Sequence, residues 1–84
     1  MKIEIYTVDY CPYCKKAVAF LDEKGVEYTR IRIDEDEEGW FEKLAVRLNK
    51  NAADLTVPQI FIDDKSIGGY TDMMALYEVG KLLL

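Results

Sequence analysis

Residues 2–24 read KIEIYTVDYCPYCKKAVAFLDEK, and this stretch decides the fold. Its first part, residues 2–7, alternates between isoleucines and more polar side chains, which is the pattern of a β-strand. Residues 12–24 predict an α-helix, because Pro12 suits the first helical position and Gly25 follows the last. The stretch therefore predicts a strand that leads through a short turn into a helix.

The turn carries Cys11-Pro12-Tyr13-Cys14, which holds the only two cysteines of a chain without histidine. Positions i and i+3 are neighbours on the first turn of a helix, within reach of a disulfide. Unpaired N–H groups and the positive end of the helix dipole favour a thiolate at Cys11. The motif predicts a redox-active dithiol in which Cys11 is the nucleophile and Cys14 resolves the intermediate. A purely structural disulfide is disfavoured, since so small a loop would hardly constrain the unfolded chain.

The rest of the chain predicts a β-α-β-α-β-β-α order. The first two strands should be parallel with a right-handed crossover, and the last two should form an antiparallel hairpin. Acidic residues 34–38 and polar residues 49–54 predict connections. The further elements are a strand over 27–33, a helix carrying Trp40, Phe41, Leu44, Ala45 and Leu48, a strand over 59–62, a turn at Asp63-Asp64, a strand over 65–68, and a helix capped by Thr71 that runs to about Lys81.

Composition limits the class of protein. Eighty-four residues allow one domain, which we expect to span residues 1–84. A net charge of −5 argues against nucleic acid or an anionic membrane as a partner. Without a membrane-length apolar run or a signal peptide, and with cysteines too close to staple a secreted fold, a cytoplasmic location is expected. Two cysteines and no histidine leave a zinc tetrahedron half empty, so no metal is expected.

Four motifs in this order resemble the small dithiol, CPYC type of the glutaredoxin family. The resemblance covers essentially the whole chain and implies a thioredoxin-like fold, a four-stranded mixed β-sheet flanked by three helices, in a monomer. It also implies glutathione as the reducing co-substrate. The motifs are Tyr6-Thr7, Cys11-Pro12-Tyr13-Cys14, residues 56–62 (TVPQIFI), and Gly68-Gly69 followed by Thr71-Asp72.

The resemblance also implies a glutathione site. It implies a cis Val57-Pro58 bond facing the dithiol, where the Val57 backbone would pair with an extended substrate. A helix N-terminus beyond a close-approaching glycine suits a carboxylate, and Asp72 suits the neighbouring amine of the γ-glutamyl group. Tyr13 would cover the bound tripeptide. The expected binding residues are Tyr13, Val57, Pro58, Gly69, Thr71 and Asp72.

Two positions depart from the family pattern. Val8 stands where a lysine is usual, three residues before the nucleophile. Lys43 or Arg47 could supply the missing cation for the glycyl carboxylate of glutathione. Tyr70 stands where a cysteine is frequent, so an additional regulatory thiol is absent.

The favoured function is a glutathione-dependent thiol-disulfide oxidoreductase that reduces protein disulfides and glutathione mixed disulfides. Its expected partners are disulfide-containing or glutathionylated proteins, ribonucleotide reductase among the candidates. One alternative has the same fold, but the protein is reduced by thioredoxin reductase and donates electrons to ribonucleotide reductase. Val8 slightly favours this alternative. Another is a dimer that bridges an iron–sulfur cluster through Cys11 and two glutathiones, which Pro12 disfavours.

Overall fold

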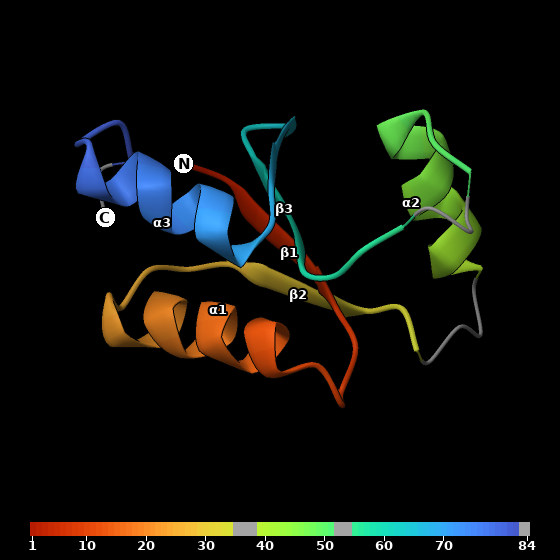
Figure 1. The fold of residues 1–84 in the computed structure, drawn as a ribbon, viewed down its shortest axis with the longest axis horizontal. Helices are drawn as coiled ribbons and strands as arrows, with labels where there is room; N and C mark the ends of the chain where they lie inside the picture. The colour runs from red at the N-terminus through yellow and green to blue at the C-terminus, as the bar shows by residue number, and fades with distance from the viewer. Residues whose placement is uncertain (35–38, 52–54, 83–84) are drawn as a thin grey trace.

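The computed structural model describes residues 1–34, 39–51 and 55–82. The element order is the predicted β-α-β-α-β-β-α (Figure 1). Parts of both predicted connections, residues 35–38 and 52–54, lie outside the described residues. The elements are β1 (Ile3–Thr7), α1 (Pro12–Glu23), β2 (Thr29–Arg32), α2 (Trp40–Leu48), β3 (Gln59–Ile62), β4 (Lys65–Gly68) and α3 (Tyr70–Glu78).

The sheet has four strands in the order β2-β1-β3-β4. Strand β1 runs parallel to β2, with Ile5 opposite Arg30, and antiparallel to β3, with Ile5 opposite Ile60. Strands β3 and β4 form the predicted antiparallel hairpin. Its turn places Asp63 and Asp64 at φ 50° and 68°, a backbone conformation that aspartate tolerates better than most residues. The mixed sheet confirms the expected thioredoxin-like fold.

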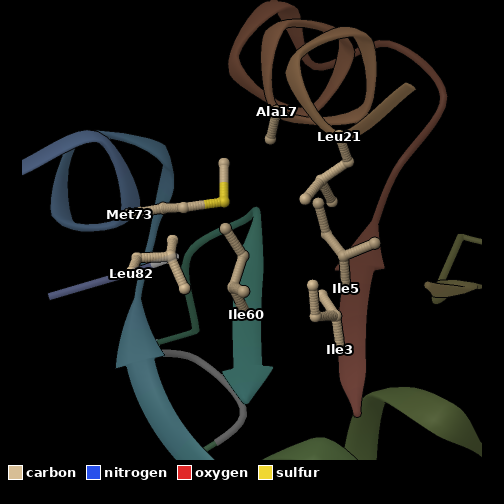
Figure 2. Close-up of a cluster of buried hydrophobic side chains, with 7 residues drawn as sticks. All are labelled: Ile3, Ile5, Ala17, Leu21, Ile60, Met73 and Leu82. Atoms are coloured by element: carbon tan, nitrogen blue, oxygen red, sulfur yellow. The ribbon is translucent and has the colours of Figure 1, made fainter. Parts of the chain in front are cut away.

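Helices α1 and α3 cover one face of the sheet, and α2 covers the other (Figure 1). Strand β1 is therefore buried on both faces, and its alternation divides the core between them. Ile3 and Ile5 point toward α1 and α3, where Figure 2 shows them with the other buried side chains of this layer. These are Ala17, Leu21, Ile60, Met73 and Leu82.

The opposite face of β1 packs against α2. Tyr6 and Val8 belong to this second cluster, and Tyr6 meets Phe61 of β3 edge to face at 5.7 Å between ring centroids. Leu44 is the fully buried contact from α2. The buried thiol of Cys14 belongs to the same cluster, so the dithiol is anchored where the two apolar layers meet the end of β1.

The last helix differs from the prediction at both ends. It begins at Tyr70 with Gly69 as its N-cap, and not with Thr71 as the cap. The reason is that the Gly69 N–H donates to Asp72 Oδ2 at 2.9 Å, which satisfies a free donor at the helix start. The helix ends at Glu78, before the predicted Lys81, and Gly80 follows with a φ of 75°.

The other element boundaries differ by a few residues. Strand β2 begins at Thr29, two residues later than the predicted strand, because Val26 and Tyr28 instead pack against the α1–α3 layer. Helix α1 ends at Glu23, and Lys24 forms its C-cap. None of the described helices combines the length and the apolar composition that crossing a membrane requires.

Candidate functional site

The two cysteines occupy the first turn of α1. Cys11 is the N-cap residue, in extended backbone conformation, and Pro12 follows at the helix start. The Cys14 backbone N–H donates to Cys11 Sγ at 3.4 Å, so the sulfur takes the place of an ordinary capping oxygen. This first turn carries no acidic side chain, while Lys15 and Lys16 follow exposed on its surface. Cys11 Sγ therefore lies at the positive end of the α1 dipole, without an acidic side chain in the first turn.

A segment distant in sequence completes the surroundings of Cys11. The Cys11 thiol donates to the Val57 carbonyl oxygen, with 3.7 Å between sulfur and oxygen, across a separation of 46 residues. The Val57-Pro58 peptide bond is cis, as the resemblance implied. No described residue accepts a hydrogen bond from the Val57 N–H. That donor belongs to a residue in contact with Cys11, and an extended ligand could use it.

The second thiol differs from the first in exposure. Cys14 is completely buried, whereas Cys11 is partly exposed. Burial is the main cause that raises the pKa of the Cys14 thiol to about 12, and the neighbouring Cys11 acts in the same direction. Cys14 is therefore held as a thiol while Cys11 is reduced, so the exposed sulfur is the one available for the first attack.

This raised pKa predicts a pH-dependent stability of the reduced protein. A thiol whose pKa is raised on folding stabilises the fold below its ordinary value of 9.0, and the contribution is lost as the pH rises toward about 12. Between about pH 8 and pH 10, the free energy of unfolding of the reduced protein should fall by roughly 1 kcal/mol more than that of the Cys14→Ser variant. Urea unfolding of both proteins under reducing conditions measures the difference. If the free energy of unfolding of both proteins changed equally with pH, the raised pKa of Cys14 would be contradicted.

A groove of about 360 Å³ lies beside the dithiol. It is open to solvent and is bounded by α1, by the segment before β3 and by the start of α3. All six residues that were expected to bind glutathione line it, so the fold brings three separate parts of the sequence to one place. The lining residues are Tyr13, Thr56, Val57, Pro58, Gly69, Tyr70, Thr71 and Asp72.

Two glycines precede α3, and Gly69 lines the groove. A Cβ atom on Gly69 would lie 3.3 Å from the Pro58 carbonyl oxygen, tighter than ordinary van der Waals contact. Gly68 has a φ of 99°, and a Cβ there would collide with the Asp72 carboxylate. Only glycine therefore fits at Gly68, and the Asp72 carboxylate keeps its place at the helix start.

Two groove residues were not among the expected binding residues. Tyr70 meets Tyr13 with 6.2 Å between ring centroids, and Tyr13, 53% exposed, also lies under the Lys16 ammonium. Thr56 is fixed by Gln59, whose Nε2 donates to the Thr56 carbonyl oxygen at 2.9 Å. Both residues are adjacent in sequence to expected binding residues, and this adjacency is the only feature of the sequence that could have indicated them.

The proposed substitutes for the missing lysine are placed elsewhere. Val8 is buried against Cys14, so this position presents no side chain to solvent. Lys43 lies over the Trp40 ring at 4.6 Å, and neither it nor Arg47 lines the groove. Arg47 is instead hydrogen-bonded to Glu4, at 2.9 Å and 3.2 Å. The expectation that Lys43 or Arg47 supplies the cation therefore gains no support from the lining of this groove.

The described part of the chain contains no group of three or more cysteine, aspartate or glutamate side chains placed to hold a metal ion. Cys11 and Cys14 form no disulfide here, so both sulfurs are present as thiols. The chemistry that this arrangement offers is attack by a sulfur on a disulfide, followed by attack of the second sulfur on the first.

Comparison with known proteins places this geometry in a family. The family model for glutaredoxin matches residues 3–67. A probable glutaredoxin of Synechocystis is 49% identical over 81 residues, which is 96% of this chain and 88% of that protein. Glutaredoxin 3 of Escherichia coli is 42% identical over 80 residues, which is 95% of this chain and 90% of that protein.

Solved structures agree with the sequence comparison. The crystal structure of a buckwheat glutaredoxin–glutathione complex superimposes with a TM-score of 0.79 at 29% identity, covering 95% of this chain and 71% of that one. The solution structure of the dithiolic glutaredoxin 2-C-Grx1 of Trypanosoma brucei brucei superimposes with a TM-score of 0.79 at 34% identity, and the match covers 95% of this chain and 80% of that one.

Proposed function

Because the chain belongs to the glutaredoxin family of thiol-disulfide oxidoreductases, we propose that glutathione is its reductant and that Cys11 and Cys14 carry the reaction. The observation that carries the proposal is the groove at the start of α3, which is lined by Asp72 and also by Val57, whose carbonyl oxygen accepts the hydrogen bond from the partly exposed Cys11. The substrates would be protein disulfides and glutathione mixed disulfides in the cytoplasm.

The groove has the chemistry that glutathione requires. The N-terminus of α3 offers backbone donors and positive potential to the α-carboxylate of the γ-glutamyl group. Asp72 offers a carboxylate to the adjacent amine, and the Val57 N–H offers a backbone partner to the cysteinyl residue. Tyr13 and Tyr70 supply an aromatic wall at the open side. A related buckwheat glutaredoxin has been crystallised with glutathione, which supports the same ligand here.

The reaction would proceed in two exchanges. Cys11 sulfur attacks a substrate disulfide, forms a mixed disulfide and releases one substrate thiolate. Cys14 then attacks Cys11 Sγ, which forms the Cys11–Cys14 disulfide and releases the second thiolate, while the proton of Cys14 passes to solvent or to that thiolate. Two glutathione molecules restore the dithiol and leave as glutathione disulfide. With a glutathionylated substrate, a second glutathione can release Cys11 directly, and Cys14 is not required.

Asp72→Asn tests the role of this carboxylate in the groove. The amide retains an acceptor for the Gly69 N–H, so α3 should still begin at Tyr70. Loss of the charge at an exposed site should raise the KM for glutathione by roughly two- to tenfold with little change in kcat. Steady-state kinetics measure the change, and Glu78→Gln at the far end of the same helix is the control. An unchanged KM would remove Asp72 from the proposed site.

A coupled assay tests the choice of reductant. The protein is supplied with a glutathionylated substrate and either glutathione with glutathione reductase or thioredoxin reductase alone, and NADPH consumption is recorded. We expect turnover with glutathione and none with thioredoxin reductase. The reverse result would establish thioredoxin reductase as the electron source. This alternative is the second candidate because Val8 is buried and no cation is present among the described residues that line the groove.

A further inference from the structure

Arg30 is a cation whose position the proposed reaction does not yet use. It lies on the edge strand β2, directly opposite Ile5 of β1. Its Nε donates to the hydroxyl oxygen of Thr7 at 3.0 Å, although Thr7 itself is completely buried. An otherwise exposed guanidinium is thus turned inward and fixed against the end of β1.

The end of β1 is also where Cys14 lies. Ala17 and Leu21 point from α1 toward the sheet and meet the Ile5 layer (Figure 2). Cys14 is one turn before Ala17 on the same fully buried face of α1, and Thr7 is two residues after Ile5 on the same face of β1. Because α1 returns antiparallel to β1 in the crossover, Thr7 lies at the level of the first turn of α1.

We propose that Arg30 is a positioning residue for the second exchange: fixed by Thr7 below the first turn of α1, its positive charge favours loss of the Cys14 proton when Cys14 attacks Cys11. The guanidinium makes no bond to the substrate and does not itself accept the proton. The proton leaves to solvent or to the departing thiolate, the Cys11–Cys14 bond forms, and the bond from Cys11 to the substrate sulfur breaks.

The groups around Cys14 support this assignment. Cys11 raises the pKa of Cys14 and Arg30 lowers it, whereas burial acts more strongly than either. Once Cys11 is in a mixed disulfide, its opposing effect on Cys14 is removed, and Arg30 then acts against burial alone. Tyr6 from β1 belongs to the same cluster, and α2 and β3 present apolar side chains there, Trp40, Leu44 and Phe61 among them.

Arg32 provides a matched comparison on the same strand. It is two residues from Arg30 and therefore on the same face of β2, but it donates to Asp34 Oδ2 at 2.8 Å. It also lies 3.9 Å from Asp9 Oδ2. The charge of Arg32 is balanced by these carboxylates at the outer end of the strand. Arg32 should therefore have little effect on the loss of the Cys14 proton.

The test separates the two exchanges with an aromatic disulfide, 5,5′-dithiobis(2-nitrobenzoate), at one equivalent. Attack by Cys11 releases the first coloured thiolate, and attack by Cys14 releases the second, so stopped-flow absorbance gives both rates. Near neutral pH and at low salt, Arg30→Gln should slow the second phase by roughly two- to fivefold and leave the first unchanged. The effect should shrink at high salt, because exposed charges are screened.

Three variants complete the test. Arg30→Lys should restore most of the second-phase rate, Thr7→Val should slow it less than Arg30→Gln does, and Arg32→Gln should leave it unchanged. A normal second phase in Arg30→Gln, equal slowing of both phases, or failure of Arg30→Lys to restore the rate would each overturn the proposal. The inference rests on the proposed dithiol reaction, but this assay contains no glutathione. Failure of the glutathione-coupled assay alone would therefore overturn the reductant and leave the role of Arg30 standing.

Discussion

Cys11→Ser is expected to abolish reduction of every disulfide substrate. Cys11 Sγ is partly exposed and contacts Val57, which lines the groove, whereas Cys14 is completely buried and has a pKa raised to about 12. No other thiol exists in the sequence to replace the nucleophile. Activity toward a small glutathionylated substrate and toward a protein disulfide, measured beside the unchanged protein, should fall to background in both cases.

The matched variant Cys14→Ser should separate the two substrate classes. It should keep reduction of the glutathionylated substrate, because glutathione itself can release Cys11 from the mixed disulfide. It should lose most of the reduction of protein disulfides, which requires the second thiol. Equal inactivity of both variants toward the glutathionylated substrate would contradict the assignment of roles.

Arg47→Met should lower the free energy of unfolding at neutral pH by about 1–3 kcal/mol. Arg47 joins α2 to the sheet: it donates to both Glu4 carboxylate oxygens and to the Tyr6 hydroxyl, and its guanidinium stacks on the Phe61 ring at 3.7 Å. The Glu4 side chain is only 14% exposed, so removal of the arginine leaves a nearly buried carboxylate with only the more distant Lys2 ammonium, at 3.8 Å, as its partner. Urea unfolding measures the loss.

The same network predicts how that loss varies with pH. The hydrogen bond from Arg47 holds the pKa of Glu4 below its ordinary value of 4.5. Its contribution is present above that value and is lost as the pH falls below it, so the difference between Arg47→Met and the unchanged protein should narrow in acid. Lys50→Met, at an exposed lysine just beyond α2, is the control and should have little effect at either pH. A difference that stays constant from neutral to acid pH would count against the Glu4 pairing.

The local features of the sequence predicted the first half of the fold well. The alternation of residues 2–7, the proline after Cys11 and the glycine after Lys24 act within a few residues, and the structure confirms the strand and the helix that they predicted. The last helix shows the limit of such signals. Thr71 is a favourable cap residue by type, but the hydrogen bond between Gly69 and Asp72 starts the helix earlier.

Long-range features could be anticipated only where a motif carried them. The cis bond at Pro58 and the groove residues followed from resemblance, because nothing within the chain's local pattern places Val57 beside Cys11. The pairing of Arg47 with Glu4 depends on how α2 lies across β1, and the contact of Arg30 with Thr7 depends on the register of β1 and β2. Neither the orientation nor the register can be read from single residues, so the sequence did not predict that Arg47 pairs with Glu4.

Mass analysis of the Cys14→Ser variant after reaction with glutathione disulfide tests the central claim most directly. We expect that one glutathione is attached to each chain, that peptide mapping places it on Cys11, and that added glutathione removes it. Asp72→Asn introduced into this variant should slow the attachment. A Cys14→Ser protein that takes up no glutathione, although it still reacts with the aromatic disulfide, would contradict the proposal that the groove beside Cys11 serves glutathione.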